Sequence, residues 1–221
     1  QAPSNFPTAA GLPTTVLTLY YDPIYTEGLA PSVRFPRERN RLLAKRLQHA
    51  PSIQMQRPRR ANRAKILCAH QHTYVEQGDG TAAILVQHSD IFTCSIHCES
   101  NFPFRKQQSD LDVHLADDTD DRTYLNCLER TLEKIRPQDY DLILYQAGVD
   151  PLAADALGKL ALTREGLDQR NQRIFTYNSA HHIPIVIFMG GGYAQPIEAS
   201  VDAFEDLFTA AAATARCHPP K

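Results

Sequence analysis

The sequence lacks an apolar run near the roughly 20 residues that cross a bilayer as a helix, so we expect no membrane partner. It also lacks an excess of charge of either sign, because the formal net charge is -2. Proteins that bind nucleic acid usually carry a surplus of basic residues that neutralises phosphates. The charge balance therefore predicts no direct nucleic-acid partner.

Cysteine is scarce, and its spacing matches neither a zinc finger nor a disulfide framework. The chain has five cysteines, an odd number: Cys68, Cys94, Cys98, Cys127 and Cys217. Reduced thiols are typical of intracellular proteins, so we expect an intracellular location, with the cytoplasm first. Residues 1–14 lack the basic start and apolar core of a signal peptide, and we expect them to be a disordered N-terminal segment.

With 221 residues, of which 43% are hydrophobic, the chain suits one domain over residues 1–221. Apolar and β-branched runs predict strands, and apolar residues three or four apart predict helices. The strands are expected at 16–20, 65–68, 91–96, 142–145 and 185–189, and the helices at 38–48, 121–135, 164–180 and 201–211. This alternation predicts an α/β fold, an open and mostly parallel sheet with helices on both faces. Residues 49–65 have no apolar period and are interpreted as a linker.

Two of the predicted strands each deliver a polar residue at their carboxyl end. The run at 142–145 leads to Asp150, and the run at 185–189 leads through three glycines to Tyr193. Ligands of open α/β sheets bind at the carboxyl edge of the strands, so we expect Asp150 and Tyr193 to face one crevice. A tyrosine hydroxyl there can donate to an oxyanion that forms on a carbonyl under attack.

Five blocks of sequence resemble the zinc-dependent histone deacetylases, and most closely the short class IV-like and bacterial members. The blocks lie at 77–83, 95–106, 145–153, 157–163 and 189–194. The resemblance covers most of the chain from Gly78 onward. It implies the arginase/deacetylase fold, a three-layer sandwich that is truncated here, and hydrolysis of acetyl-lysine or similar N-acyl amines by zinc-activated water.

The resemblance also implies roles for particular residues. Asp150 matches a zinc ligand of the family, and Tyr193 matches the tyrosine that stabilises the oxyanion. Substrate contacts are implied for Phe102, which matches a tunnel-lining residue, and for the glycine turns: Gly148, Gly191 and Gly192. Ser95 matches a position that helps to bind a structural monovalent cation such as potassium.

The chain departs from the family pattern in two places. The linker at 49–65 stands where the family has several helices and the adjacent histidine pair that serves as acid and base. Counting back from Gly78, Glu76 stands in place of a zinc-binding histidine, and His72 lies four residues before it. Strand residues two apart share a face, so a rebuilt site of His72, Glu76 and Asp150 is a hypothesis. The pair His181 and His182 precedes a strand, and we interpret it as a turn.

Three functions stay open from the sequence. The first is a zinc-dependent hydrolase of an acylated lysine or acylated small amine. The second is a catalytically impaired or inactive relative, kept for binding or encoded by a shortened gene. The third is an unrelated doubly wound domain that binds phosphate, which the lack of a Gly-x-Gly-x-x-Gly or Walker pattern disfavours. The natural substrate and the oligomeric state are left open.

Overall fold

The computed structural model describes residues 17–28, 35–59, 82, 85, 88–103 and 106–217. This part of the chain contains both strands and helices, which alternate from β4 onward. The strands are β1 (Leu17–Tyr20), β2 (Ile53–Gln56), β3 (Cys94–Cys98), β4 (Leu111–Leu115), β5 (Ile143–Ala147) and β6 (Ile185–Met189). The helices are α1 (Ile24–Glu27), α2 (Glu38–Leu47), α5 (Asp121–Lys134), α6 (Arg164–His181) and α7 (Glu198–Cys217), with a 3₁₀ turn η1 (Pro137–Asp139).

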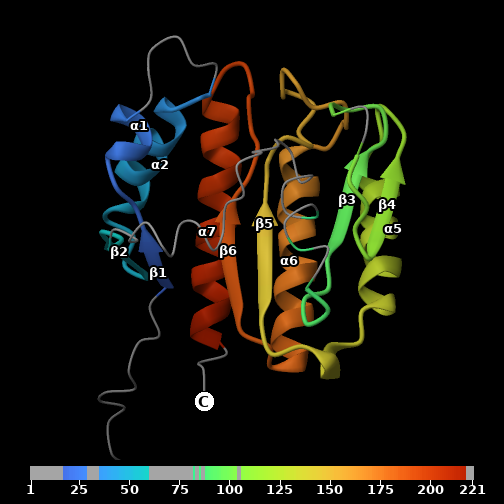
Figure 1. Cartoon of the computed structure of the whole chain (residues 1–221). Helices are drawn as coiled ribbons and strands as arrows, with labels where there is room; N and C mark the ends of the chain where they lie inside the picture. The colour runs from blue at the N-terminus through green and yellow to red at the C-terminus, as the bar shows by residue number, and fades with distance from the viewer. Residues whose placement is uncertain are drawn as a thin grey trace, which may run out of the picture.

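All described strand pairs are parallel, which confirms the α/β fold class. β1 pairs with β2, β3 pairs with β4, and β5 pairs with β6. The registers begin at Leu17 opposite Ile53, Cys94 opposite Leu111, and Ile143 opposite Ile185. In Figure 1 the β5 and β6 pair lies in the middle of the molecule, between the other two pairs. The carboxyl ends of β5 and β6 therefore meet at one edge, because parallel strands end on the same side.

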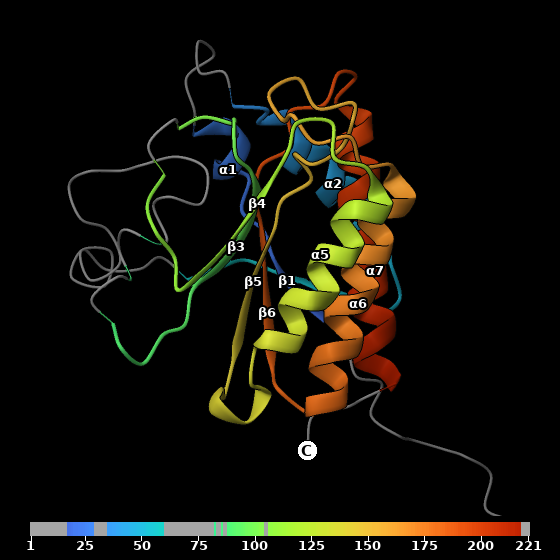
Figure 2. The same ribbon diagram turned by 90° about the vertical axis from the view of Figure 1, so that its right-hand side faces the viewer.

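The three long helices α5, α6 and α7 run side by side along one face of the strands (Figure 2). Their apolar faces supply most of the core, as the three-to-four-residue periodicity predicted. The fully or almost fully buried side chains include Leu128 of α5, Leu167 and Phe175 of α6, and Phe204 and Leu207 of α7. Each described helix is too short or too polar to span a bilayer.

Local capping fixes where α5 and α6 begin. The Asp120 carboxylate accepts from Thr123 N at 2.9 Å, and the Thr163 hydroxyl accepts from Gly166 N at 3.0 Å. Such side chains satisfy amide groups that the first helical turn leaves without partners. The helix α6 ends at His181, and its C-cap residue His182 has the left-handed φ of 56°. The histidine pair therefore lies where α6 turns toward β6, with His181 still helical and His182 in the turn.

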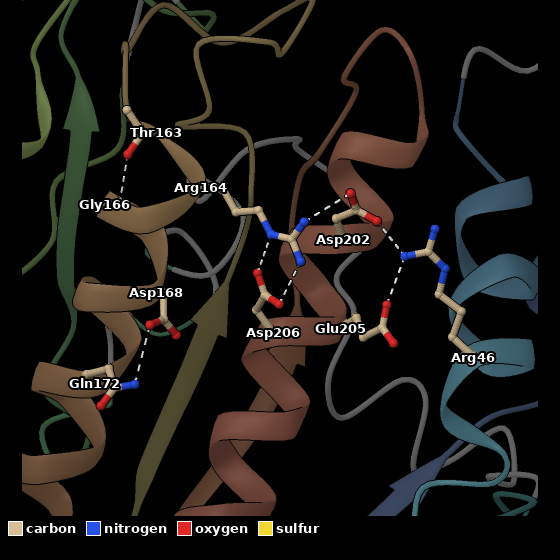
Figure 3. A network of polar contacts seen from close by, with 9 residues as sticks. All are labelled: Arg46, Thr163, Arg164, Gly166, Asp168, Gln172, Asp202, Glu205 and Asp206. Atoms are coloured by element: carbon tan, nitrogen blue, oxygen red, sulfur yellow. Dashed lines mark hydrogen bonds and ion pairs between the residues drawn. The ribbon is translucent and has the colours of Figure 1, made fainter.

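Ion pairs on the outer surface connect three helices (Figure 3). Asp202 of α7 lies between two guanidinium groups, Arg46 of α2 and Arg164 of α6. Arg46 also pairs with Glu205 at 2.8 Å, and Arg164 pairs with Asp206 at 2.5 Å. These contacts hold α2 and α6 against opposite sides of α7.

The prediction of a linker over residues 49–65 is wrong for residues 53–56, which form β2. The side chain of Ile53 is buried and Met55 packs against the core, whereas Gln54 is exposed. This alternation has the period of two that a strand with one buried face requires. It is too short to stand out in the sequence, and pairing with β1 stabilises it. Residues 60–65 and the N-terminal segment 1–14 lie outside the described residues.

Candidate functional site

The turn after β5 places Asp150 between two glycine-rich segments. A Cβ on Gly191 would lie only 2.5 Å from Asp150 Oδ1, and a Cβ on Gly148 would also collide with this oxygen. A Cβ on Gly190 would lie 2.8 Å from Gly148 Cα. Side chains on these glycines are thus excluded by the carboxylate and by the close approach of the two turns. The turns need glycine because the Asp150 carboxylate occupies the space between them.

The turn after β6 carries Tyr193 and adjoins the turn that carries Asp150. Gly191 O accepts a hydrogen bond from Val149 N at 2.9 Å, which joins the two turns directly. Gly192 has a φ of 147°, and a Cβ there would lie 2.5 Å from the Val149 side chain. Its backbone therefore requires glycine both for conformation and for packing. As the sequence predicted, Asp150 and Tyr193 follow neighbouring strand ends.

Asp155 connects the loop after Asp150 to the backbone of Tyr193 through hydrogen bonds. Its Oδ2 accepts from Tyr193 N at 2.5 Å, and its Oδ1 accepts from Leu157 N at 2.9 Å and Gly158 N at 2.7 Å. Tyr193 O in turn accepts from Ala156 N at 3.2 Å. Charge-assisted bonds of this kind are stronger than those between neutral groups. The Asp155 carboxylate therefore orders both the loop after Asp150 and the turn that carries Tyr193.

A buried arginine supports the glycine turn from the side of α2. Arg39 is 2% exposed, and its Nη1 donates to Gly192 O at 2.8 Å while its Nη2 donates to Gly190 O at 3.2 Å. The guanidinium also lies over the Phe204 ring, 4.9 Å from its centroid. Arg39 was not among the site residues that the sequence predicted. Its spacing of four from the buried Leu43 was the available signal.

A second buried arginine supports the turn after β5. Arg170 of α6 is 4% exposed, and its Nη1 donates to Gly148 O at 2.7 Å. Its Nε and Nη2 donate to Asn171 Oδ1 at 3.2 Å and 3.0 Å. The same Asn171 oxygen accepts from the Tyr145 hydroxyl at 2.8 Å. The sequence analysis missed Arg170 too, although it follows the buried Leu167 by three positions on the core face.

The electrostatic environment of Asp150 combines opposing effects. Desolvation is the largest of them, and it raises the pKa of this carboxyl group above its usual range. The nearby negative charge of Asp155 raises the pKa further, whereas the positive charges of Arg170 and Arg39 lower it. The two guanidinium groups therefore favour the ionised carboxylate in a site that otherwise disfavours charge.

Phe102 and Ser95 lie on the side of β3. Phe102 is 56% exposed, and its loop is joined to the loop after Asp150 because Lys159 Nζ donates to Ser100 Oγ at 2.8 Å. Ser95 lies on β3, with its hydroxyl 2.8 Å from His97 Nδ1. The predicted roles of Phe102 as a substrate contact and of Ser95 as a cation ligand stay predictions.

The described residues do not form a complete zinc site. A catalytic zinc ion takes about three protein ligands and keeps one open position. Within the described residues, no group of three histidine, cysteine, aspartate or glutamate side chains is arranged to hold a metal ion. Of the three ligands that the sequence predicted, Asp150 lies within the described residues, and His72 and Glu76 lie outside them.

Parallel strands under a layer of helices define an α/β protein, and its candidate site has an aspartate and a tyrosine on the turns after β5 and β6. A model of the histone deacetylase domain matches residues 75–208. This match extends over more than half of the chain, so the chain belongs to the histone deacetylase family.

Two curated relatives match about half of the chain. An uncharacterized protein of Picosynechococcus sp. is 46% identical over 124 residues, covering 56% of this chain and 41% of the relative. Histone deacetylase 2 of Arabidopsis thaliana is 28% identical over 121 residues, covering 53% of this chain and 31% of the relative. The matched part thus spans less than half the length of either relative.

Solved structures share the fold. A histone deacetylase homologue from Aquifex aeolicus superposes with a TM-score of 0.51 at 21% identity, covering 62% of this chain and 39% of the homologue. A homologue complexed with SAHA gives 0.51 at 20% identity, with 62% and 39% covered. Acetylpolyamine aminohydrolase from Burkholderia pseudomallei gives 0.50 at 20% identity, with 61% and 41% covered. At these identities the likeness establishes the fold alone.

Proposed function

We propose that the site belongs to a hydrolase that removes acyl groups from acetyl-lysine or a similar N-acyl amine. The observation that carries the proposal is the placement of Asp150 and Tyr193 on adjoining turns, which Val149 N and Gly191 O connect at 2.9 Å. Two neighbours with solved structures, a homologue bound to SAHA and an acetylpolyamine aminohydrolase, make acylated amines the first substrates to test.

In this proposal Asp150 is one ligand of a zinc ion, with His72 and Glu76 as its partners. The zinc ion, when bound, would lower the pKa of a water molecule and polarise the amide carbonyl. Tyr193 would donate its hydroxyl to the carbonyl oxygen as negative charge develops there. Asp155 would keep the backbone of Tyr193 in place, and Phe102, Gly148, Gly191 and Gly192 would line the substrate. A monovalent cation at Ser95 would have a structural role.

A catalytically impaired relative is the second candidate. It is favoured because the described residues hold no group of three histidine, cysteine, aspartate or glutamate side chains that could bind a metal ion, and because Glu76 stands in place of the family's zinc-binding histidine. A protein of this kind would keep the fold but would neither retain zinc nor turn over an acylated amine. Its role would then be to bind a partner or ligand.

Zinc content and hydrolysis together distinguish the two candidates. The purified chain is dialysed with zinc, its metal content is measured, and it is assayed with an acetyl-lysine reporter and an acetylated polyamine. The hydrolase proposal expects about one zinc per chain, lost in Asp150→Asn and in a His72→Ala, Glu76→Ala double variant. Tyr193→Phe should keep the zinc and lower kcat by roughly 100-fold to 1,000-fold. A folded chain that holds no zinc and hydrolyses neither substrate supports the impaired relative.

A further inference from the structure

The peptide unit that joins Gly148 to Val149 is held at both of its polar ends. Its carbonyl oxygen, on Gly148, accepts from Arg170 Nη1 at 2.7 Å. Its amide nitrogen, on Val149, donates to Gly191 O at 2.9 Å. One bond therefore ties this peptide to α6, and the other ties it to the turn that leads to Tyr193. Since both groups lie in one rigid plane, the two bonds fix the orientation of that plane.

This peptide sets the direction of Asp150, which is the next residue. The Asp150 carboxylate has no room to move toward the turns, because Oδ1 already fills the space that a Cβ on Gly148 or Gly191 would need. A rotation of the plane between Gly148 and Val149 would carry the carboxylate out of that space. The bond to Arg170 opposes such a rotation from the side of α6.

Burial takes the charged Arg170 side chain out of water, which costs free energy. Its described hydrogen bonds offset this cost, although none of them goes to a carboxylate. The guanidinium contacts uncharged groups, among them Gly148 O, Asn171 Oδ1, the Tyr124 side chain and the Tyr145 ring, whose centroid is 5.8 Å away. A charge taken out of water is usually tolerated only when its donors are satisfied. Asn171 receives two of these donors and also the Tyr145 hydroxyl. Tyr145 and Asn171 thus hold the planar guanidinium group of Arg170 in the orientation that directs Nη1 at Gly148 O.

We propose that Arg170 is a positioning residue that aims Asp150 by holding the Gly148 carbonyl, with Asn171 and Tyr145 orienting its guanidinium. Arg170 touches neither substrate nor metal in this assignment. Its charge favours the ionised Asp150 carboxylate, and its hydrogen bond positions that carboxylate through one peptide plane. The functional part of the proposal rests on the proposed deacetylase function, whereas the structural part does not.

Amide hydrogen exchange at Val149 tests the structural part. The variant Arg170→Met keeps the length and the apolar stem of the side chain but removes its donors. Leu167→Ala is the control, because Leu167 is 1% exposed on the same helix and its truncation destabilises α6 without altering the donors to Gly148. We expect Arg170→Met to speed Val149 exchange at least tenfold relative to the amides of the β5 and β6 ladder. Leu167→Ala should speed the exchange of Val149 and of the ladder amides by the same factor.

An equal change of Val149 and ladder exchange in Arg170→Met would overturn the proposal. If that variant does not fold, Arg170→Lys carries the same test, because lysine offers a point charge in place of a rigid fork. The rate of Val149 amide exchange relative to that of the ladder amides should then rise about threefold. An unchanged ratio of these two rates would also overturn the proposal.

Kinetics test the functional part. In an active wild type, Arg170→Met should lower kcat more than tenfold with KM within twofold, whereas Leu167→Ala should lower kcat less than twofold. Equal kcat losses in the two variants would contradict the positioning role. Wild-type protein that binds no zinc and lacks activity would refute the proposed function, and the exchange ratio would still decide the role of Arg170 in the turn.

Discussion

Arg39 Nη1 lies 2.8 Å from Gly192 O, so a side chain of α2 supports a turn 153 residues further along the chain. The same guanidinium donates to Gly190 O, so it binds the backbone of the turn on both sides of Gly191. Gly191 in turn accepts from Val149 N beside Asp150. The buried Arg39 and Arg170 therefore act on adjoining turns from two different helices.

Replacing Arg39 should destabilise the whole domain. Arg39→Met would leave Gly190 O and Gly192 O without these donors in a buried place, which typically costs about 1–3 kcal/mol for each lost group. We expect the free energy of unfolding, measured in urea, to fall by about 2–4 kcal/mol. Arg41→Met is the matched control, since the Arg41 side chain is 56% exposed and should change stability by less than about 0.5 kcal/mol. Equal effects of the two substitutions would show that the buried contacts contribute little.

Replacing Asp155 should loosen the loop after Asp150 and the turn that carries Tyr193. Asp155→Asn keeps the shape of the side chain, but its amide group can face Tyr193 N with a donor in place of an acceptor. We expect a loss of about 1–3 kcal/mol of unfolding free energy, together with faster amide exchange at Tyr193, Leu157 and Gly158. Asp139→Asn is the control, because the Asp139 side chain is 42% exposed in a local pair with Arg136. Unchanged exchange at Tyr193 would argue against the role of Asp155.

Alkaline pH should weaken the fold partly through Tyr145. Burial raises the pKa of Tyr145 to about 12 from a usual 10.0. The folded state then keeps the phenolic proton at a pH where the unfolded state has lost it, so stability falls as pH rises. The contribution is complete below about pH 10 and declines between about pH 10 and 12. Urea unfolding across pH 9–11.5 should show a shallower decline for Tyr145→Phe than for the wild type, and equal slopes would refute this assignment.

The ion pairs around Asp202 should respond to salt (Figure 3). The Asp202 side chain is 32% exposed and bridges Arg46 and Arg164, so its pairs are partly screened by water. We expect Asp202→Asn to lower the unfolding free energy by about 0.2–1 kcal/mol at low ionic strength, and by less in 1 M NaCl. Glu205→Gln, which removes one pair with Arg46, should have the smaller effect. A loss that does not depend on salt would show that Asp202 acts through packing.

The sequence could predict much of the framework because the signals are local. A short apolar run predicts a strand, and apolar residues three or four positions apart predict a helix. Both patterns depend only on neighbours along the chain. The strands that lead to Asp150 and Tyr193 are of this kind. Parallel pairing of β5 and β6 then brings the two residues to one edge, since a helix of the length of α6 connects strands that run in the same direction.

The support of the site was decided by the tertiary structure alone. Arg39 and Arg170 look like ordinary surface arginines in the sequence, because burial of a charge depends on acceptors that fold against it from distant segments. The strand β2 was missed for a similar reason, since four residues become a strand here by pairing with β1. The sequence by itself determined which residues stand at the carboxyl ends of the strands. The packing of α2 and α6 decided how firmly they are held, because the carbonyl acceptors lie in other segments, 151 and 153 residues from Arg39 and 22 residues from Arg170.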